Sequence, residues 1–142
     1  MLALRDGKIL LVRHFRPGKH DFWSGPGGGV EGDEELYQAA EREAFEETGL
    51  HVRAHGLAYI DELIDGSGRM VKFWFQADYV SGEIDVSRNP AEGESIIQAG
   101  WFDRDDLPAG HVFPEILRDR LWSDLADGIT TPIKLPLRQS IF

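Results

Sequence analysis

The chain contains no cysteine among its 142 residues. Disulfide frameworks, cysteine nucleophiles and zinc–thiolate sites are therefore excluded. The chain also lacks any run of about 18 apolar residues, the length that a membrane-spanning helix needs. The few apolar residues before Arg5 do not have the form of a signal peptide. We therefore expect a cytoplasmic protein with no membrane partner.

Basic residues are scarce. Fifteen Lys and Arg stand against 25 Asp and Glu, which gives a formal net charge of −10. Proteins that bind polymeric nucleic acid depend on clustered basic charge, so no such partner is expected. A small phosphorylated substrate remains possible, because bound metal ions can invert the local field. The hydrophobic fraction of 42% is typical of a globular protein, and the length suggests one domain over residues 1–142.

The pattern of apolar residues predicts a chain of mixed α/β type. Asp33 is the expected N-cap of a helix that Gly49 ends. Residues 15–21 are predicted to form a loop, and the tail over 130–142 shows no clear pattern. The predicted strands are 2–4, 9–13, 52–63, 70–80 and 95–102, and the predicted helices are 33–48 and 114–125.

The first predicted helix carries carboxylates on the face that should be buried. At 100° per residue, Glu43 and Glu47 both lie within about 20° of Leu36. They continue the apolar stripe that Leu36, Ala39 and Ala40 begin, where an ordinary amphipathic helix would place Leu or Ile.

A Glu-rich helix is usually interpreted as having a solvent-exposed face. The positions of these glutamates are electrostatically unfavourable even on such a face. Like charges four residues apart repel, and the helix dipole disfavours Glu46 and Glu47 in the last turn. A compensating cation is therefore expected. Oxygen ligands without cysteine or a histidine cluster indicate Mg²⁺, with Mn²⁺ as a substitute. Arg42 can pair with Glu46, either as a minor surface ion pair or to fix the orientation of the carboxylates.

The segment from Gly28 to Leu50 resembles the Nudix box. Gly28, Glu34 and the run REAFEETGL over 42–50 occupy every specified position of that pattern. The resemblance implies an α/β/α sandwich on a mixed sheet, with the box as a loop–helix–loop. It also implies Mg²⁺-dependent hydrolysis of a pyrophosphate bond in a nucleoside diphosphate linked to another moiety.

The resemblance also assigns roles within the box. Glu46 and Glu47 are expected metal ligands, and Glu43 is a further ligand or a base that acts on metal-bound water. The backbone carbonyl of Gly28 is expected to complete the metal site, because glycine allows a close backbone approach.

Other acids and Arg42 have supporting or catalytic roles by the same resemblance. Glu34 and Arg42 are expected to support the loop and the carboxylates. In this family the base often lies outside the box, and here Glu92 and Glu94 are the candidates, with Glu94 slightly favoured. The alternative for either is an ordinary surface acid.

Substrate contacts are expected from the segment before the helix. Arg13 and Arg16 are candidates for binding phosphate or sugar hydroxyls, Trp23 for stacking on a base, and Gly27 and Gly28 for backbone contact. Surface charge for the arginines and core packing for the tryptophan are the alternatives. Further candidates are Lys19, His20, Phe22 and Trp74.

The sequence leaves several properties open. They are the identity of the nucleotide and leaving group, the number of metal ions, and whether the protein is a homodimer. The main alternative function is a nucleotide-sensing Nudix module without catalysis. The intact box favours the hydrolase.

Overall fold

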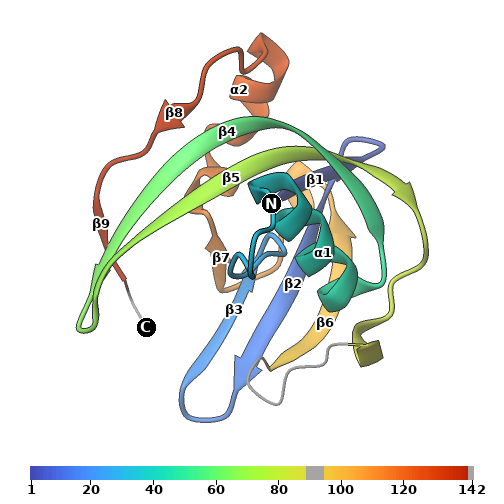
Figure 1. The fold of residues 1–142 in the computed structure, drawn as a ribbon, viewed down its shortest axis with the longest axis horizontal. Coiled ribbons are helices and arrows are strands. Elements are labelled where there is room, and N and C mark those ends of the chain that lie inside the picture. Colours follow the sequence, from blue (N-terminus) through green and yellow to red (C-terminus); the bar gives the residue numbers. More distant parts are fainter. Residues whose placement is uncertain (89–94, 141–142) are drawn as a thin grey trace.

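The computed structural model describes residues 1–88 and 95–140. Within these residues the chain forms one nine-stranded mixed sheet (Figure 1). The strands are β1 (Leu2–Arg5), β2 (Lys8–Arg16), β3 (His20–Ser24), β4 (His51–Asp65), β5 (Gly68–Ser81), β6 (Ile96–Phe102), β7 (His111–Phe113), β8 (Ile133–Lys134) and β9 (Arg138–Gln139).

The strand order is β7-β3-β2-β1-β5-β4-β8, with β6 paired to β2 and β9 paired to β4. The pairs β1–β5, β3–β7, β4–β8 and β4–β9 are parallel, and the other pairs are antiparallel. The strands β4 and β5 form a long hairpin, which makes up the curved upper layer in Figure 1.

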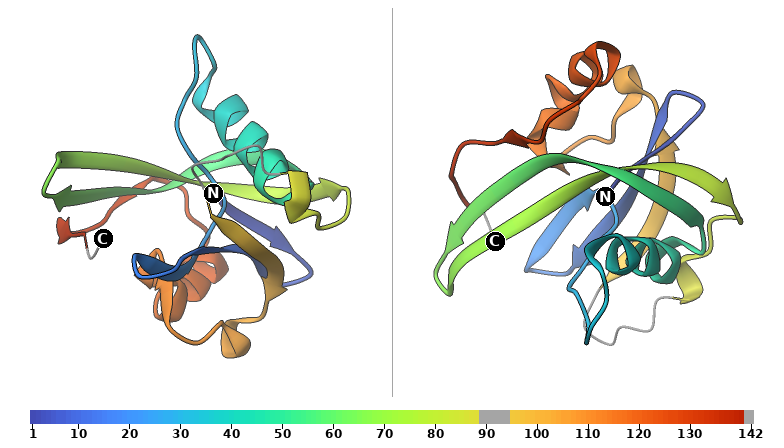
Figure 2. Two further views of the ribbon diagram at one scale, coloured as in Figure 1. Left: turned by 90° about the horizontal axis from the view of Figure 1, so that it is seen from below. Right: turned by 45° about the horizontal axis from the view of Figure 1, so that its top comes forward.

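Helices cover both faces of the strands, as Figure 2 shows. Helix α1 (Leu36–Thr48) lies on one side, and α2 (Leu121–Asp127) lies on the other with the 3₁₀ segment Glu115–Arg118. The predicted α/β/α layering on a mixed sheet is confirmed. Among the described residues, no helix is both long and apolar enough to cross a membrane. Two further 3₁₀ turns are Val86–Arg88 and Arg104–Asp106.

The consecutive apolar residues of β2 are buried on both faces of the sheet. Ile9 and Leu11 pack in the core beneath Leu117 and Leu121 on the α2 side. Leu10 points the other way and packs with Ala44 of α1. Side chains alternate across a strand, so a strand with a layer on each face reads as an unbroken apolar run.

The first helix begins later than predicted. Its N-cap is Glu35 rather than Asp33, and the Glu35 amide donates to Gln38 Oε1 at 3.0 Å. A turn precedes it, in which the Glu34 amide donates to the carbonyl of Glu31. The predicted stop is confirmed, since Gly49 has a φ of 75° and its amide donates to Phe45.

Two other expectations differ from the structure, and the tail, for which no structure was predicted, forms two short strands. The predicted loop over 15–21 shortens to a turn, because cross-strand pairing holds β2 and β3 together as far as Arg16 and His20. The predicted helix over 114–125 is broken at Asp119, whose φ of −124° and ψ of −68° depart from helical geometry. The tail contributes β8 and β9, both paired to β4.

Candidate active site

A glycine-rich loop crosses from the end of β3 to α1. The Gly27 amide donates to Glu47 Oε2 at 2.9 Å, which ties this loop to the last turn of the helix. Gly27 has a φ of 148°, a conformation that favours glycine. The loop is therefore held against the carboxylate end of α1.

Gly28 lies directly against Glu43. A Cβ atom at position 28 would lie 2.5 Å from Glu43 Oε1 and 2.6 Å from its carboxyl carbon, which is closer than real contacts allow. A glycine is therefore required for the loop backbone to approach this carboxylate.

The burial of α1 agrees with the predicted stripe at its C-terminal end. Glu47 is 1% exposed and Glu43 is 9% exposed, among the most buried polar residues described. Ala39 is also buried, but Leu36 is 43% exposed and lines a cavity instead of the core. The two carboxylates thus occupy core-like positions, and only the first residue of the stripe was placed wrongly.

Arg42 connects the loop and the carboxylates through one guanidinium group. Its Nε and Nη2 donate to the two oxygens of Glu34 at 2.7 and 3.1 Å. Its Nη1 donates to Glu43 Oε1 at 3.1 Å and to Glu46 Oε2 at 3.0 Å, so the predicted pair with Glu46 is present. Nη2 also donates to the carbonyl of Gly29.

This network shifts the protonation equilibria of its members. The hydrogen bond to Glu34 is the largest cause that raises the pKa of Arg42 above its ordinary value. The same bond lowers the pKa of Glu34. Both groups therefore stay charged at neutral pH, and the guanidinium offsets part of the negative charge of the glutamates.

The donor set fits a hard divalent cation in its chemistry. Glu43, Glu46 and Glu47 offer carboxylate oxygens, and the backbone of Gly28 lies against Glu43. Within residues 1–88 and 95–140, no group of three acidic or histidine side chains is already arranged around one point. Arg42 is the cation that Glu43 and Glu46 share in this arrangement.

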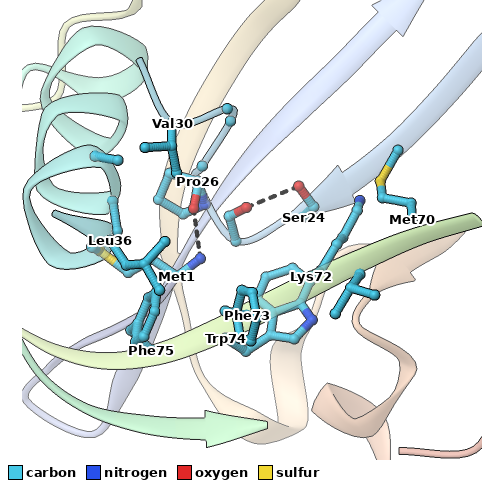
Figure 3. Close-up of a pocket in the computed structure, with 17 residues that line it drawn as sticks. Met1, Ser24, Pro26, Val30, Leu36, Met70, Lys72, Phe73, Trp74 and Phe75 are labelled. Atoms are coloured by element: carbon cyan, nitrogen blue, oxygen red, sulfur yellow. Dashed lines mark hydrogen bonds between the residues drawn. The ribbon is translucent and has the colours of Figure 1, made fainter. Parts of the chain in front are cut away.

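A cavity of about 570 Å³ lies beside the glycine loop (Figure 3). Val30 and Leu36 face it from the loop and α1, and Trp74 and Phe75 face it from β5. Its size is within the range of small-molecule binding sites. The cavity is therefore large enough for a small organic ligand, and Gly28 in its wall lies against Glu43.

A second cavity, of about 320 Å³, shares three wall residues with the first: Ser24, Lys72 and Trp74. Asp61 and Arg138 also line it. The two cavities are therefore neighbouring parts of one cleft along β5. The remaining lining residues of the second cavity are Phe22, Leu63, Phe113, Glu115, Gln139 and Ser140.

Three predicted substrate contacts lie away from both cavities. Arg13 is bound to Asp21 by hydrogen bonds of 2.9 and 2.8 Å. Trp23 is buried and packs edge-on against Phe102, with ring centroids 5.0 Å apart. Arg16 ends β2, and neither it nor the other two lines either cavity. The predicted contact of these three side chains with a ligand in the cleft is therefore not supported by its lining.

The other candidates divide into three groups. Gly27 and Gly28 line the first cavity, and Phe22 and Trp74 line the cleft although strand aromatics usually serve the core. Lys19 is exposed at the β2–β3 turn, and His20 lies near the Phe22 ring. The base candidates Glu92 and Glu94 lie outside the described residues.

Sequence reasoning missed Asp61 and Arg138. Asp61 is fully buried and accepts two hydrogen bonds from Arg138. A signal for the acid was available, since Asp61 follows the apolar Tyr59 by two residues on one strand and so shares its face. No local pattern pointed to the arginine.

Comparison with known proteins identifies the family. The profile of the NUDIX domain matches residues 1–121. The chain is 35% identical to the oxidized purine nucleoside triphosphate hydrolase of Danio rerio over 130 residues, which cover 88% of this chain and 75% of that protein.

Two further relatives extend the comparison. The NAD-capped RNA hydrolase NudC of Chromobacterium violaceum is 36% identical over 91% of this chain, but the chain spans only 45% of its length. An ADP-ribose pyrophosphatase from Streptococcus suis superposes with a TM-score of 0.65 at 23% identity. That match covers 98% of this chain and 94% of the other, and it supports the fold. With the glutamates of α1 set beneath a glycine loop, these matches establish that the chain belongs to the Nudix hydrolase family.

Proposed function

We propose that this enzyme uses Mg²⁺ to hydrolyse the pyrophosphate bond of a nucleoside diphosphate linked to a second moiety, or of a related nucleotide. The observation that carries the proposal is the placement of Glu43 and Glu47. Both carboxylates are buried under the glycine loop beside a cavity sized for a small ligand. The hydrolysis of nucleotides by relatives of this chain supports the substrate class.

Glu46 and Glu47 are the proposed metal ligands, with the Gly28 carbonyl. Glu43 is a further ligand or the base. When bound, Mg²⁺ would neutralise phosphate oxygens and lower the pKa of an attacking water. Mn²⁺ is an expected substitute because it accepts the same oxygen ligands.

The residues of the chain position the reactants. The backbone of Gly27 and Gly28 borders the cavity, where it offers polar groups to a diphosphate. Arg42 holds Glu43 and Glu46 in fixed orientations through Nη1. Correct orientation of the carboxylates accounts for a large part of such catalysis, because the reaction depends on positioning and charge stabilisation.

A panel of substrates tests the proposal. Purified protein with Mg²⁺ is offered ADP-ribose, NADH, nucleotide sugars, dinucleoside polyphosphates and oxidised nucleoside triphosphates, and release of phosphate or mononucleotide is measured. We expect hydrolysis of at least one compound, abolished by EDTA and restored by Mg²⁺.

Tight binding of these compounds in calorimetry without turnover would support a sensing module instead. Hydrolysis that persists in EDTA at the full rate would contradict the metal-dependent mechanism. A carboxylic ester serves as a further control. Hydrolysis of the ester but of none of the pyrophosphates would contradict the proposal that the enzyme cleaves a pyrophosphate bond.

A further inference from the structure

The second cavity is lined by four strands and by the C-terminal tail. Phe22 comes from β3, Asp61 from β4, Trp74 from β5 and Phe113 from β7. The tail forms the remaining wall through Arg138, Gln139 and Ser140. These tail residues lie beyond residues 1–121, the part that matches the family profile.

Backbone pairing fixes the tail along β4. The Leu135 amide donates to the carbonyl of Ile60 at 2.8 Å, and the Ser140 amide donates to the carbonyl of Ile64 at 2.8 Å. Figure 1 shows β8 and β9 running beside the outer edge of the long hairpin. The tail is therefore a built part of the sheet at this end of the cleft.

An ion pair between Arg138 and Asp61 anchors the tail to the protein interior. Arg138 Nη2 donates to Asp61 Oδ2 at 2.7 Å and Nε donates to Oδ1 at 3.3 Å. Nη1 of the same arginine lies 3.4 Å from a carboxylate oxygen of Glu115. Trp74 donates its indole N–H to Asp61 Oδ2 at 3.5 Å. Because Asp61 is fully buried, this ion pair fixes the tail beside Trp74, which lines both cavities.

The lining of the second cavity favours a flat, uncharged ring over a phosphate group. Phe22, Trp74 and Phe113 supply aromatic surface, and the rings of Phe22 and Phe113 meet edge-on with centroids 5.7 Å apart. The charged groups among the described lining residues balance. The two acids are Asp61 and Glu115, and the two bases are Lys72 and Arg138. Aromatic surface together with polar groups suits a heteroaromatic base, which carries donors and acceptors in its plane.

We propose that Arg138, Gln139 and Ser140 determine which organic group this enzyme accepts, by forming one wall of a pocket for a heteroaromatic base at the end of the cleft. Arg138 is the positioning residue of that wall, acting through Asp61. This inference rests on the proposed function, because it assigns the base-bearing end of the same substrate.

The main test is the variant Arg138→Gln, compared with Arg69→Gln as a matched control. Arg69 lies on β5, forms an ion pair with Glu62 and lines neither cavity. For the best nucleotide of the panel, we expect Arg138→Gln to raise KM about tenfold with kcat nearly unchanged, because binding of the base is lost equally in the ground state and the transition state. Arg69→Gln should keep both constants.

A second variant guards against misfolding. Arg138→Gln leaves the Asp61 carboxylate buried without its cation, which destabilises a protein strongly. The double variant Asp61→Asn with Arg138→Gln removes both charges together. It should fold, as thermal unfolding will show, and should still have the raised KM because the wall has lost its ion pair.

A binding measurement separates this inference from the proposed function. Nucleosides carry the base but no phosphate. Their binding without Mg²⁺, measured by calorimetry, therefore reports on this pocket alone. Wild type and Arg69→Gln should bind a purine or pyrimidine nucleoside, and the two Arg138 variants should bind it at least about tenfold more weakly.

If substrates are hydrolysed but nucleosides bind equally to all variants, the pocket assignment is wrong and the proposed function stands. If nucleosides bind in an Arg138-dependent way but no pyrophosphate is cleaved, the proposed function is wrong and the pocket stands. An unchanged KM in both folded Arg138 variants would also overturn the inference.

Discussion

The Gly27 amide and Glu47 Oε2 are 2.9 Å apart, and this hydrogen bond joins the glycine loop to a carboxylate that is almost fully buried. The loop and the last turn of α1 are therefore held in one fixed relation. Because the bond uses a backbone donor, it constrains the loop whatever side chains flank it.

Replacing Glu47 with Gln tests the part this carboxylate plays in hydrolysis. The amide oxygen of glutamine can still accept the Gly27 hydrogen bond, so we expect the melting temperature to change little. Activity with the best substrate should fall about 100-fold or more, because a neutral ligand holds Mg²⁺ poorly. Steady-state rates at saturating Mg²⁺ measure the effect.

Glu41→Gln is the control for this substitution. Glu41 is on the same helix, and its Oε1 accepts a hydrogen bond from the Ala54 amide, which glutamine can keep. Its activity should stay near that of wild type. Near-normal turnover by Glu47→Gln would refute the assigned metal ligand.

Replacing Gly28 with Ala tests the close approach of the loop to Glu43. The added methyl carbon would lie 2.5 Å from Glu43 Oε1, so the carboxylate must move. We expect the Mg²⁺ concentration for half-maximal activity to rise about tenfold, since misoriented ligands bind metal less tightly. A titration of activity against Mg²⁺ measures this.

Gly29→Ala makes the matched comparison, because a Cβ atom there would meet nothing within 4 Å. Its Mg²⁺ titration should coincide with that of wild type. Identical titrations for both alanine variants would show that the contact between Gly28 and Glu43 has no part in metal binding.

His14 makes the stability of the fold depend on pH. Burial is the largest cause that lowers the pKa of His14 from 6.5 to about 4, and its ring stacks on Phe22 at 4.6 Å. A lowered pKa in the folded state means that the unfolded chain takes up the proton first as pH falls. The stability from neutral His14 is thus complete above pH 6.5 and is lost between pH 6.5 and 4.

His14→Gln should remove this part of the pH dependence. Urea unfolding at pH 7 and pH 5 gives the free energy of unfolding for both proteins. Wild type should lose on the order of 1–2 kcal/mol more than the variant between these two pH values. Equal losses would mean that His14 has the same proton affinity in both states.

Tyr59 joins β4 to α2, and its hydroxyl donates to Asp124 Oδ2 at 2.6 Å. Tyr59→Phe removes the donor and leaves the ring packed, so we expect a loss of about 1–2 kcal/mol in the free energy of unfolding. Tyr37→Phe makes the same chemical change at a residue that is 41% exposed, and should have little effect. Equal stability of the two variants would show that the Tyr59 hydrogen bond adds nothing.

Periodicity predicted those parts of the molecule whose pattern is local. The run of apolar residues in β2 and the placement of Glu43 and Glu47 among buried positions both follow from side-chain direction along one element. The start of α1 was less predictable, because Asp33 is a preferred N-cap residue and Glu35 is not. In the structure Glu35 is the N-cap, in a capping box with Gln38.

The far wall of the cleft could not be predicted in this way. Asp61 and Arg138 are 77 residues apart, and their pairing depends on the tail lying parallel to β4. Two-residue strands such as β8 and β9 are too short to show an alternating pattern. Long-range pairing of this kind is visible only in the folded chain.

The single guanidinium of Arg42 places three acids under a shared evolutionary constraint. Glu34, Glu43 and Glu46 all bind it, so a substitution at any one of them alters the charge balance felt by the other two. Related sequences should therefore conserve or exchange these four positions together. We expect covariation among these four positions in an alignment of related sequences.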